Sequence, residues 1–123
     1  MKKVDASIII PTKNAGNTFK AVLDGVFSQN YGSFETIIID SGSTDETIEI
    51  AKNYSLEIIR IKPSEFGHGK TRNLGVKLAK GKYVVFLTQD VIPNNKEWLE
   101  EILKPLSDKK VAAVYGRQVP KEE

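Results

Sequence analysis

The sequence contains no cysteine, which excludes a disulfide framework and thiolate chemistry. It has no apolar run of transmembrane length, and the run at residues 8–10 is too short for the core of a signal peptide. It also lacks an excess of charge, because 18 basic and 16 acidic side chains leave a formal charge of +2 with both signs interspersed. We therefore expect a soluble cytoplasmic protein that does not bind nucleic acid.

The apolar content is enough for one hydrophobic core. The chain has 123 residues, of which 40% are apolar, and this suits a single domain over residues 1–123. Short apolar runs alternate with stripes of three- and four-residue spacing, a pattern typical of parallel strands joined by helical crossovers. The predicted fold class is α/β, a three-layer α/β/α domain with a mostly parallel sheet. Strands are expected at residues 7–10, 36–39, 56–61, 83–87 and 111–115, and helices are expected to begin near residues 19, 44, 71 and 94.

Two strands carry further expectations. Pro11 has no N–H to donate to a ladder and is expected to end the first strand. The run at residues 83–87 is apolar throughout, which predicts a central strand buried on both faces.

Capping residues refine the helix ends. Ser43 is followed three positions later by Glu46, and Asn94 is followed by Glu97 at the same spacing. Both pairs match the pattern of an N-terminal cap and predict helix starts. Gly81 stands where a left-handed C-cap is expected after the third helix.

A glycine-rich segment at residues 65–75, EFGHGKTRNLG, looks like the end of a phosphate-binding loop. The P-loop signature needs a glycine where Ser64 stands, and the dinucleotide fingerprint needs one where Arg72 stands, so both motifs are absent. The glycines and the helix that follows can still favour a phosphate or a base edge. His68, the single histidine, is expected to have a structural or binding role and not to act as a general base.

Polar segments follow three of the predicted strands, at residues 11–14, 40–42 and 88–90. Because ligands of open α/β sheets bind beyond the carboxyl ends of the strands, these segments are expected to be neighbours at one site. Asp40 ends an apolar strand and needs a partner, which can be a ligand, a nearby lysine or the start of the second helix. Lys13 could lie near the phosphates of a ligand, but a solvated lysine is the safer expectation in a chain with 18 basic residues.

Four segments in this order, IIIPTKNAG, IIIDSGSTDET, TRNLG and VVFLTQDVIP, closely resemble the nucleotide-sugar-binding half of family 2 glycosyltransferases, which have the GT-A fold. The TRNLG, FLTQD and YGRQ pieces look more like bacterial rhamnosyltransferases than like cellulose or chitin synthases. The resemblance covers nearly the whole chain, although family members are usually much longer.

The resemblance implies roles for particular residues. The last aspartate of the short acidic motif, here Asp90 in Thr88-Gln89-Asp90, would ligate Mn²⁺ or Mg²⁺; the alternative is a turn or capping aspartate. Two acids often found beside it are absent, and Gln89 could only donate or accept a hydrogen bond, with the ribose as a candidate partner. The expected nucleotide-binding residues are Pro11, Thr12, Asn14, Asp40, Ser41, Arg72 and Gln89.

The resemblance also implies substrates. The sugar donor would be a dTDP- or UDP-sugar, with rhamnose as the specific expectation, and the acceptor a saccharide or lipid-linked molecule bound by a missing second half. No catalytic residue is assigned, since the general base is expected beyond the chain end. The full-length enzyme would work at the inner face of the membrane, and the surface left by the missing half predicts a homo-oligomer. Alternatives are a non-catalytic nucleotide-binding or assembly module and, ranked lower, a nucleotidyltransferase, whose glycine-rich loop residues 11–16 lack.

Overall fold

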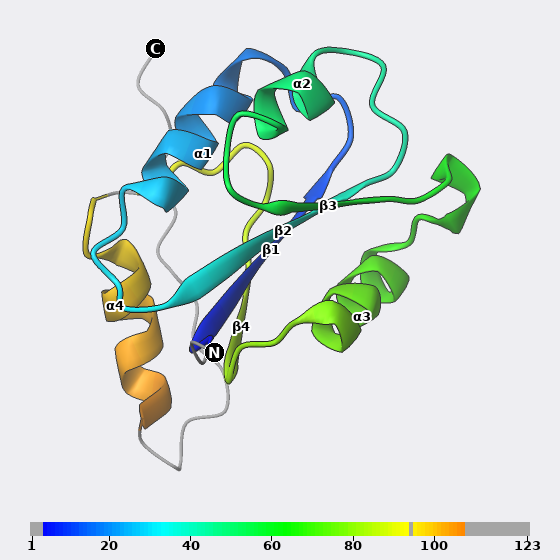
Figure 1. The fold of residues 1–123 in the computed structure, drawn as a ribbon. Coiled ribbons are helices and arrows are strands. Elements are labelled where there is room, and N and C mark those ends of the chain that lie inside the picture. The colour runs from blue at the N-terminus through cyan, green and yellow to red at the C-terminus, as the bar shows by residue number, and fades with distance from the viewer. Residues whose placement is uncertain (1–3, 94, 108–123) are drawn as a thin grey trace.

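The computed structural model describes residues 4–93 and 95–107 and has an α/β fold around a parallel sheet (Figure 1). The strand order is β3-β2-β1-β4, and every neighbouring pair is parallel. β1 and β2 form the centre of this sheet and pair over their whole lengths. The parallel α/β sheet predicted from the alternating pattern is confirmed. The strands are β1 (Ala6–Thr12), β2 (Phe34–Asp40), β3 (Glu57–Arg60) and β4 (Tyr83–Phe86).

Helices cover both faces of the sheet, which gives the predicted three layers (Figure 1). The helices are α1 (Phe19–Phe27), α2 (Thr47–Ala51), α3 (His68–Leu78) and α4 (Trp98–Leu103), with short 3₁₀ turns at Gly16–Thr18, Pro63–Glu65 and Lys104–Ser107. None of the helices in the described residues is long and apolar enough to cross a membrane.

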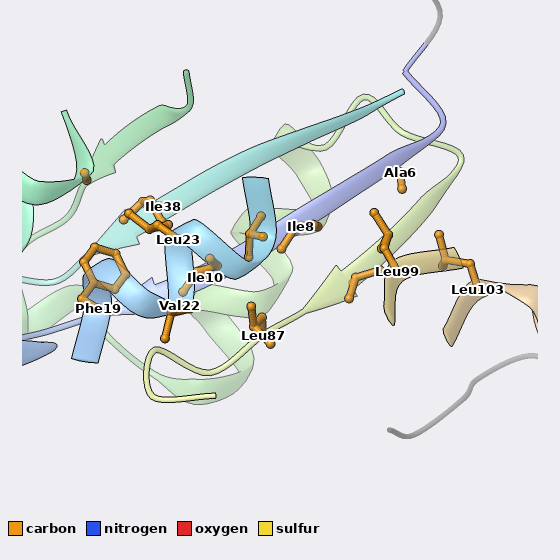
Figure 2. Close-up of a cluster of buried hydrophobic side chains, with 13 residues drawn as sticks. Ala6, Ile8, Ile10, Phe19, Val22, Leu23, Ile38, Leu87, Leu99 and Leu103 are labelled. Atoms are coloured by element: carbon orange, nitrogen blue, oxygen red, sulfur yellow. The ribbon is translucent and has the colours of Figure 1, made fainter. Parts of the chain in front are cut away.

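The core follows from the two-residue period of the strands. Ile8 and Ile10 face α1, α2 and α4, and Figure 2 shows them among the side chains of α1 and α4. Ile9, between them, points to the other face and packs with Leu74 and Leu78 of α3. The apolar stripe of α1 is buried as its spacing predicts, with Phe19, Val22, Leu23 and Val26 all at 0% exposure.

The prediction that Pro11 ends the first strand is wrong, because β1 continues through it to Thr12. The carbonyl of Ile9 accepts a hydrogen bond from Leu87 N on the β4 side, whereas that of Thr12 accepts one from Ser41 N on the β2 side. By this alternation Pro11 faces the β4 side, where the pairing has already ended at Phe86. Its missing N–H therefore costs no ladder hydrogen bond.

The predicted central position of residues 83–87 is also wrong for the described sheet. β4 lies at its end, and the side chain of Phe86 is 41% exposed. The strand predicted at residues 111–115 lies outside the described residues.

The capping predictions for Ser43 and Gly81 are wrong, and that for Asn94 falls on a residue outside the described part of the chain. The side chain of Ser43 donates to Asp40 and does not cap a helix, so α2 begins only at Thr47. Asn94 lies outside the described residues, and Glu97 is the N-cap of α4. Gly81 is not in the left-handed region.

Gly81 instead allows a close approach between the chain before β4 and the start of β1. A Cβ atom at this position would lie 2.6 Å from the backbone carbon of Ala6. The third helix also begins at His68, three residues before its predicted start near Thr71.

The packing of α3 on the sheet generates a prediction about two of its glycines. A Cβ at Gly75 would lie 2.6 Å from Cγ2 of Ile9, whereas a Cβ at Gly69 would meet no heavy atom within 4 Å. We expect Gly75→Ala to lower the free energy of unfolding by about 1–3 kcal/mol because of overpacking. Gly69→Ala, the control in the same helix, should leave stability unchanged or raise it by up to about 1 kcal/mol. Urea unfolding measures both, and equal effects of the two variants would contradict the described helix–sheet contact.

Candidate functional site

A pocket of about 400 Å³ lies at the carboxyl ends of β1, β2 and β4, beside the first half of α3. This volume is in the range typical of small-molecule sites, and its place at the sheet edge is the one expected for a parallel α/β sheet. The pocket is lined by Pro11, Thr12, Lys13, Ser41, Pro63, Phe66, His68, Thr71, Arg72, Phe86, Leu87, Thr88 and Gln89.

The buried carboxylate of Asp40 joins the segments behind this pocket. Its Oδ1 accepts hydrogen bonds from the hydroxyls of Thr12 (2.7 Å) and Ser43 (2.5 Å). Its Oδ2 accepts from the backbone N–H groups of Gly42 (3.1 Å) and Ser43 (2.9 Å). The end of β1, the end of β2 and the loop after β2 are therefore held by one side chain that is 0% exposed.

Two opposing effects act on the pKa of Asp40. Burial raises this pKa, but the hydrogen bonds from Ser43, Thr12 and Gly42 together lower it more, so the pKa lies below its ordinary value of 3.8. The side chain is therefore ionised at neutral pH even though it is buried among apolar strands.

Asn14 ties the loop after β1 to the loop before α2. It has a left-handed backbone, with φ of 47°. Its Oδ1 accepts hydrogen bonds from the backbone N–H groups of Thr44 (2.7 Å) and Asp45 (3.3 Å), and its own N–H donates to Ser43 Oγ (2.8 Å). The Asn14 side chain thus acts as a brace within the protein.

Gln89 links the loop after β1 to the loop after β4. Its Oε1 accepts a hydrogen bond from the backbone N–H of Lys13 (2.8 Å), and its Nε2 donates to the Lys13 carbonyl (3.2 Å). This two-way pairing joins residues 76 positions apart in the chain. It confirms the expectation that residues 11–14 and 88–90 are neighbours.

The polar and charged lining of the pocket suits an anion. Lys13 and Arg72 line it, and among the described residues no carboxylate does. The guanidinium carbon of Arg72 lies 5.9 Å from the centroid of the Phe86 ring, a cation–π contact at the pocket wall. His68 packs edge-on against Phe66, with ring centroids 5.2 Å apart.

Asp90 directly follows the pocket-lining Gln89 and is exposed. In the described part of the chain no three histidine, cysteine or acidic side chains gather into a complete metal site. A single exposed carboxylate fits Mg²⁺ or Mn²⁺ only if water and the oxygens of a bound ligand complete the shell, and these ions accept such a shell. The residues present are therefore compatible with a metal shared with a ligand.

The predicted nucleotide-binding residues fall into two groups. Five of them line the pocket: Pro11, Thr12, Ser41, Arg72 and Gln89. Asp40 and Asn14 do not line it, and both are hydrogen-bonded to other protein groups. Their contact with a nucleotide, like that of the other five, stays a prediction.

Several lining residues were not predicted as site residues. Lys13 was expected to be solvated, and Phe86 was expected inside a central strand. In the register, Phe86 is the partner of Ile9, which packs on the α3 side of the sheet. The two-residue period of the strand would have placed Phe86 on that side if its partner had been known.

The Asp40 network generates a pH-dependent prediction. Asp40→Asn removes one acceptor oxygen from a buried cluster of donors, and we expect it to cost about 2–3 kcal/mol of stability at about pH 7. The folded state lowers the pKa of Asp40, so the ionised carboxylate contributes fully to the free energy of unfolding above the ordinary pKa of 3.8. This contribution is lost as the pH falls through the lower pKa of the folded state. The cost should therefore shrink toward about pH 3 in urea unfolding experiments. Asp90→Asn, at an exposed position, is the control and should change stability by less than about 0.5 kcal/mol. A cost for Asp40→Asn that does not depend on pH would contradict the assignment.

Three comparisons with known proteins identify relatives of this chain. The chain is 49% identical over 116 residues to the O-antigen chain rhamnosyltransferase WbaN of Salmonella anatum, an alignment that covers 93% of this chain and 37% of the relative. Its structure is similar to that of S. aureus TarS 1-349 in complex with UDP-GlcNAc, with a TM-score of 0.76, 28% identity, and coverage of 96% of this chain and 37% of that one.

A further solved structure contains a metal ion. The chain is similar to glucosyl-3-phosphoglycerate synthase from Mycobacterium tuberculosis in complex with Mn²⁺, UDP and phosphoglyceric acid, with a TM-score of 0.66, 26% identity, and coverage of 84% of this chain and 39% of that one. The chain thus spans between a third and two fifths of the length of these proteins. The model of Glycosyl transferase family 2 matches residues 7–123. The chain therefore belongs to family 2 of the glycosyltransferases and has their GT-A fold.

Proposed function

We propose that this chain is the part of a family 2 glycosyltransferase that binds the sugar donor, a nucleoside diphosphate sugar. The observation that carries the proposal is the pocket at the carboxyl ends of β1, β2 and β4. Lys13 and Arg72 line it, no carboxylate of the described residues does, and the exposed Asp90 directly follows its wall. Such a pocket attracts the two negative phosphates, while one carboxylate outside the lining is free to hold a cation against them.

Each group has a proposed task in binding the sugar donor. The hydroxyls of Thr12 and Ser41 and the guanidinium of Arg72 would contact the nucleoside, as the family resemblance implies. Asp40 would act indirectly, because its hydrogen bond to Thr12 fixes the orientation of that hydroxyl. A divalent ion, Mn²⁺ or Mg²⁺, would neutralise charge on the departing diphosphate when it is bound to Asp90.

The preferred sugar donor is dTDP-rhamnose. The 49% identity to a rhamnosyltransferase supports rhamnose. The TarS complex holds UDP-GlcNAc, and this keeps a UDP-sugar as the second candidate. We propose transfer with inversion to a saccharide or lipid-linked acceptor, as part of polysaccharide biosynthesis.

The remaining machinery is proposed to lie outside these residues. Because the chain spans 37% of the rhamnosyltransferase WbaN, the acceptor site and the general base are assigned to the portion that this chain does not cover. The predicted cytoplasmic location, at the inner face of the membrane for a full-length enzyme, belongs to this proposal. The homo-oligomer stays a prediction.

A ligand panel tests the proposal. Thermal unfolding is measured with dTDP, UDP, GDP and ADP, each with and without Mn²⁺. A ligand at about 100 times its dissociation constant adds about 2.7 kcal/mol to the free energy of unfolding. We expect dTDP or UDP to stabilise the chain, and Mn²⁺ to increase the effect.

Asp90→Asn separates the metal from the nucleotide. This variant should retain the shift given by the nucleotide alone and lose the additional shift given by Mn²⁺, because it removes the charged ligand of the ion. Glu101→Gln, an exposed carboxylate on α4, is the control and should keep both shifts. If no nucleoside diphosphate stabilises the protein, the proposed function is wrong; if Asp90→Asn keeps the full response to Mn²⁺, the metal assignment is wrong.

A further inference from the structure

The side chain of Gln89 continues the pairing of two strands beyond the point where the strands end. β1 and β4 are paired from Ala6 with Tyr83 to Ile9 with Phe86, and Lys13 and Gln89 lie beyond the ends of both strands. There the amide of Gln89 accepts from the Lys13 N–H and donates to the Lys13 carbonyl. One side chain thus satisfies both backbone groups of a residue that the sheet itself does not hold.

This pairing needs an amide. A carboxylate at position 89 could accept from the N–H of Lys13, but it has no hydrogen to donate and would place an ionised oxygen against the Lys13 carbonyl. An alanine would leave both backbone groups of Lys13 to solvent. The glutamine therefore fixes the backbone of Lys13 in a way that neither substitute can.

A fixed backbone determines where the Lys13 side chain starts. Lys13 lines the pocket, and so do Gln89 and Arg72, whereas no described carboxylate does. Lys20 forms an ion pair with Asp24 on α1, whereas among the described residues no acid is recorded as a partner of the Lys13 ammonium. The Lys13 ammonium is therefore available to form a charge-assisted hydrogen bond with a phosphate group.

We propose that Lys13 binds the diphosphate of the sugar donor and that Gln89 is the positioning residue that holds Lys13 in place. This inference rests on the proposed function, since it concerns the same pocket. Of the two alternatives for Lys13 that the sequence left open, it selects the one near the phosphates, and it gives Gln89 a task other than the predicted contact with the ribose.

A double-mutant cycle tests the inference. Isothermal titration calorimetry gives the dissociation constant of dTDP, and of UDP, for the unaltered chain, Lys13→Met, Gln89→Ala and the double variant, all without metal. We expect Lys13→Met to weaken binding about tenfold, the effect of losing one charge-assisted hydrogen bond. Gln89→Ala should weaken it about threefold in the presence of Lys13 and leave it unchanged in the Lys13→Met background, because Gln89 acts through Lys13.

Two controls test whether the contact of Lys13 is to the diphosphate. Lys77→Met removes an exposed lysine of α3 that does not line the pocket, and it should bind dTDP as the unaltered chain does. Inorganic pyrophosphate is used as a competitor of dTDP. The Lys13→Met variant should bind pyrophosphate more weakly than the unaltered chain does, by about the same factor as for dTDP, because the lost contact is to the phosphates.

The outcomes distinguish the inference from the proposed function. If the unaltered chain binds neither dTDP nor UDP, the proposed function fails and the inference fails with it. If the unaltered chain binds and Lys13→Met binds equally well, only the role of Lys13 is overturned. If the losses of affinity in the two single variants multiply in the double variant, the coupling of Gln89 to Lys13 is overturned. If Lys13→Met binds pyrophosphate as tightly as the unaltered chain does, the contact of Lys13 with the diphosphate is overturned.

Discussion

The hydrogen-bonded carboxylate of Asp40 is the constraint on which the rest of the site depends. An ionised group that is 0% exposed is tolerated only where donors surround it, and here two hydroxyls and two backbone N–H groups do so. These donors come from the end of β1 and from the loop after β2. The requirement to satisfy one buried charge therefore fixes the relative position of two strand ends that belong to distant parts of the chain.

The two aspartates near the pocket, Asp40 and Asp90, both lie outside its lining. Asp40 is buried among its donors and Asp90 is exposed next to Gln89, so neither lines the pocket, whose lining consists of lysine, arginine, hydroxyl, amide, imidazole and apolar side chains. An acid inside the pocket would repel a diphosphate, whereas an acid just outside it can hold a cation that the diphosphate shares. The positions of the two aspartates outside the lining thus support the proposed binding of a nucleotide sugar in this pocket.

Much of the fold was predictable from the sequence because local patterns determine it. The two-residue period of the isoleucine strands and the stripe of α1 each bury one side of an element, and the crossover rule then makes the strands parallel. The order of the polar segments also placed Thr12, Ser41 and Gln89 at one edge of the sheet, and all three line the pocket. Three of the four motifs that carry the family resemblance include the end of a strand, and the fourth, TRNLG, lies in α3.

The predictions that failed, and the contacts that were not predicted, concern partners that are distant in sequence or that compete locally. Ser43 has the local pattern of a helix cap, but a buried carboxylate three residues earlier competes for its hydroxyl and its N–H. Pro11 was expected to end a strand, and only the shorter length of β4 shows why it does not. Lys13 is exposed, as expected of a solvated lysine, but the hydrogen bonds of its backbone to the side chain of Gln89, 76 residues away, had no local signal. Local propensity cannot supply such information.

Diffraction from crystals of the chain grown with dTDP and Mn²⁺ tests the central claim most directly, because the anomalous signal of manganese locates the ion independently of the protein coordinates. The account predicts one manganese peak within coordination distance of the Asp90 carboxylate and of diphosphate oxygens, with the diphosphate beside Lys13 and Asp40 still enclosed by Thr12 and Ser43. A diphosphate bound away from this pocket, or a manganese ion ligated by Asp40 in place of Asp90, would contradict it.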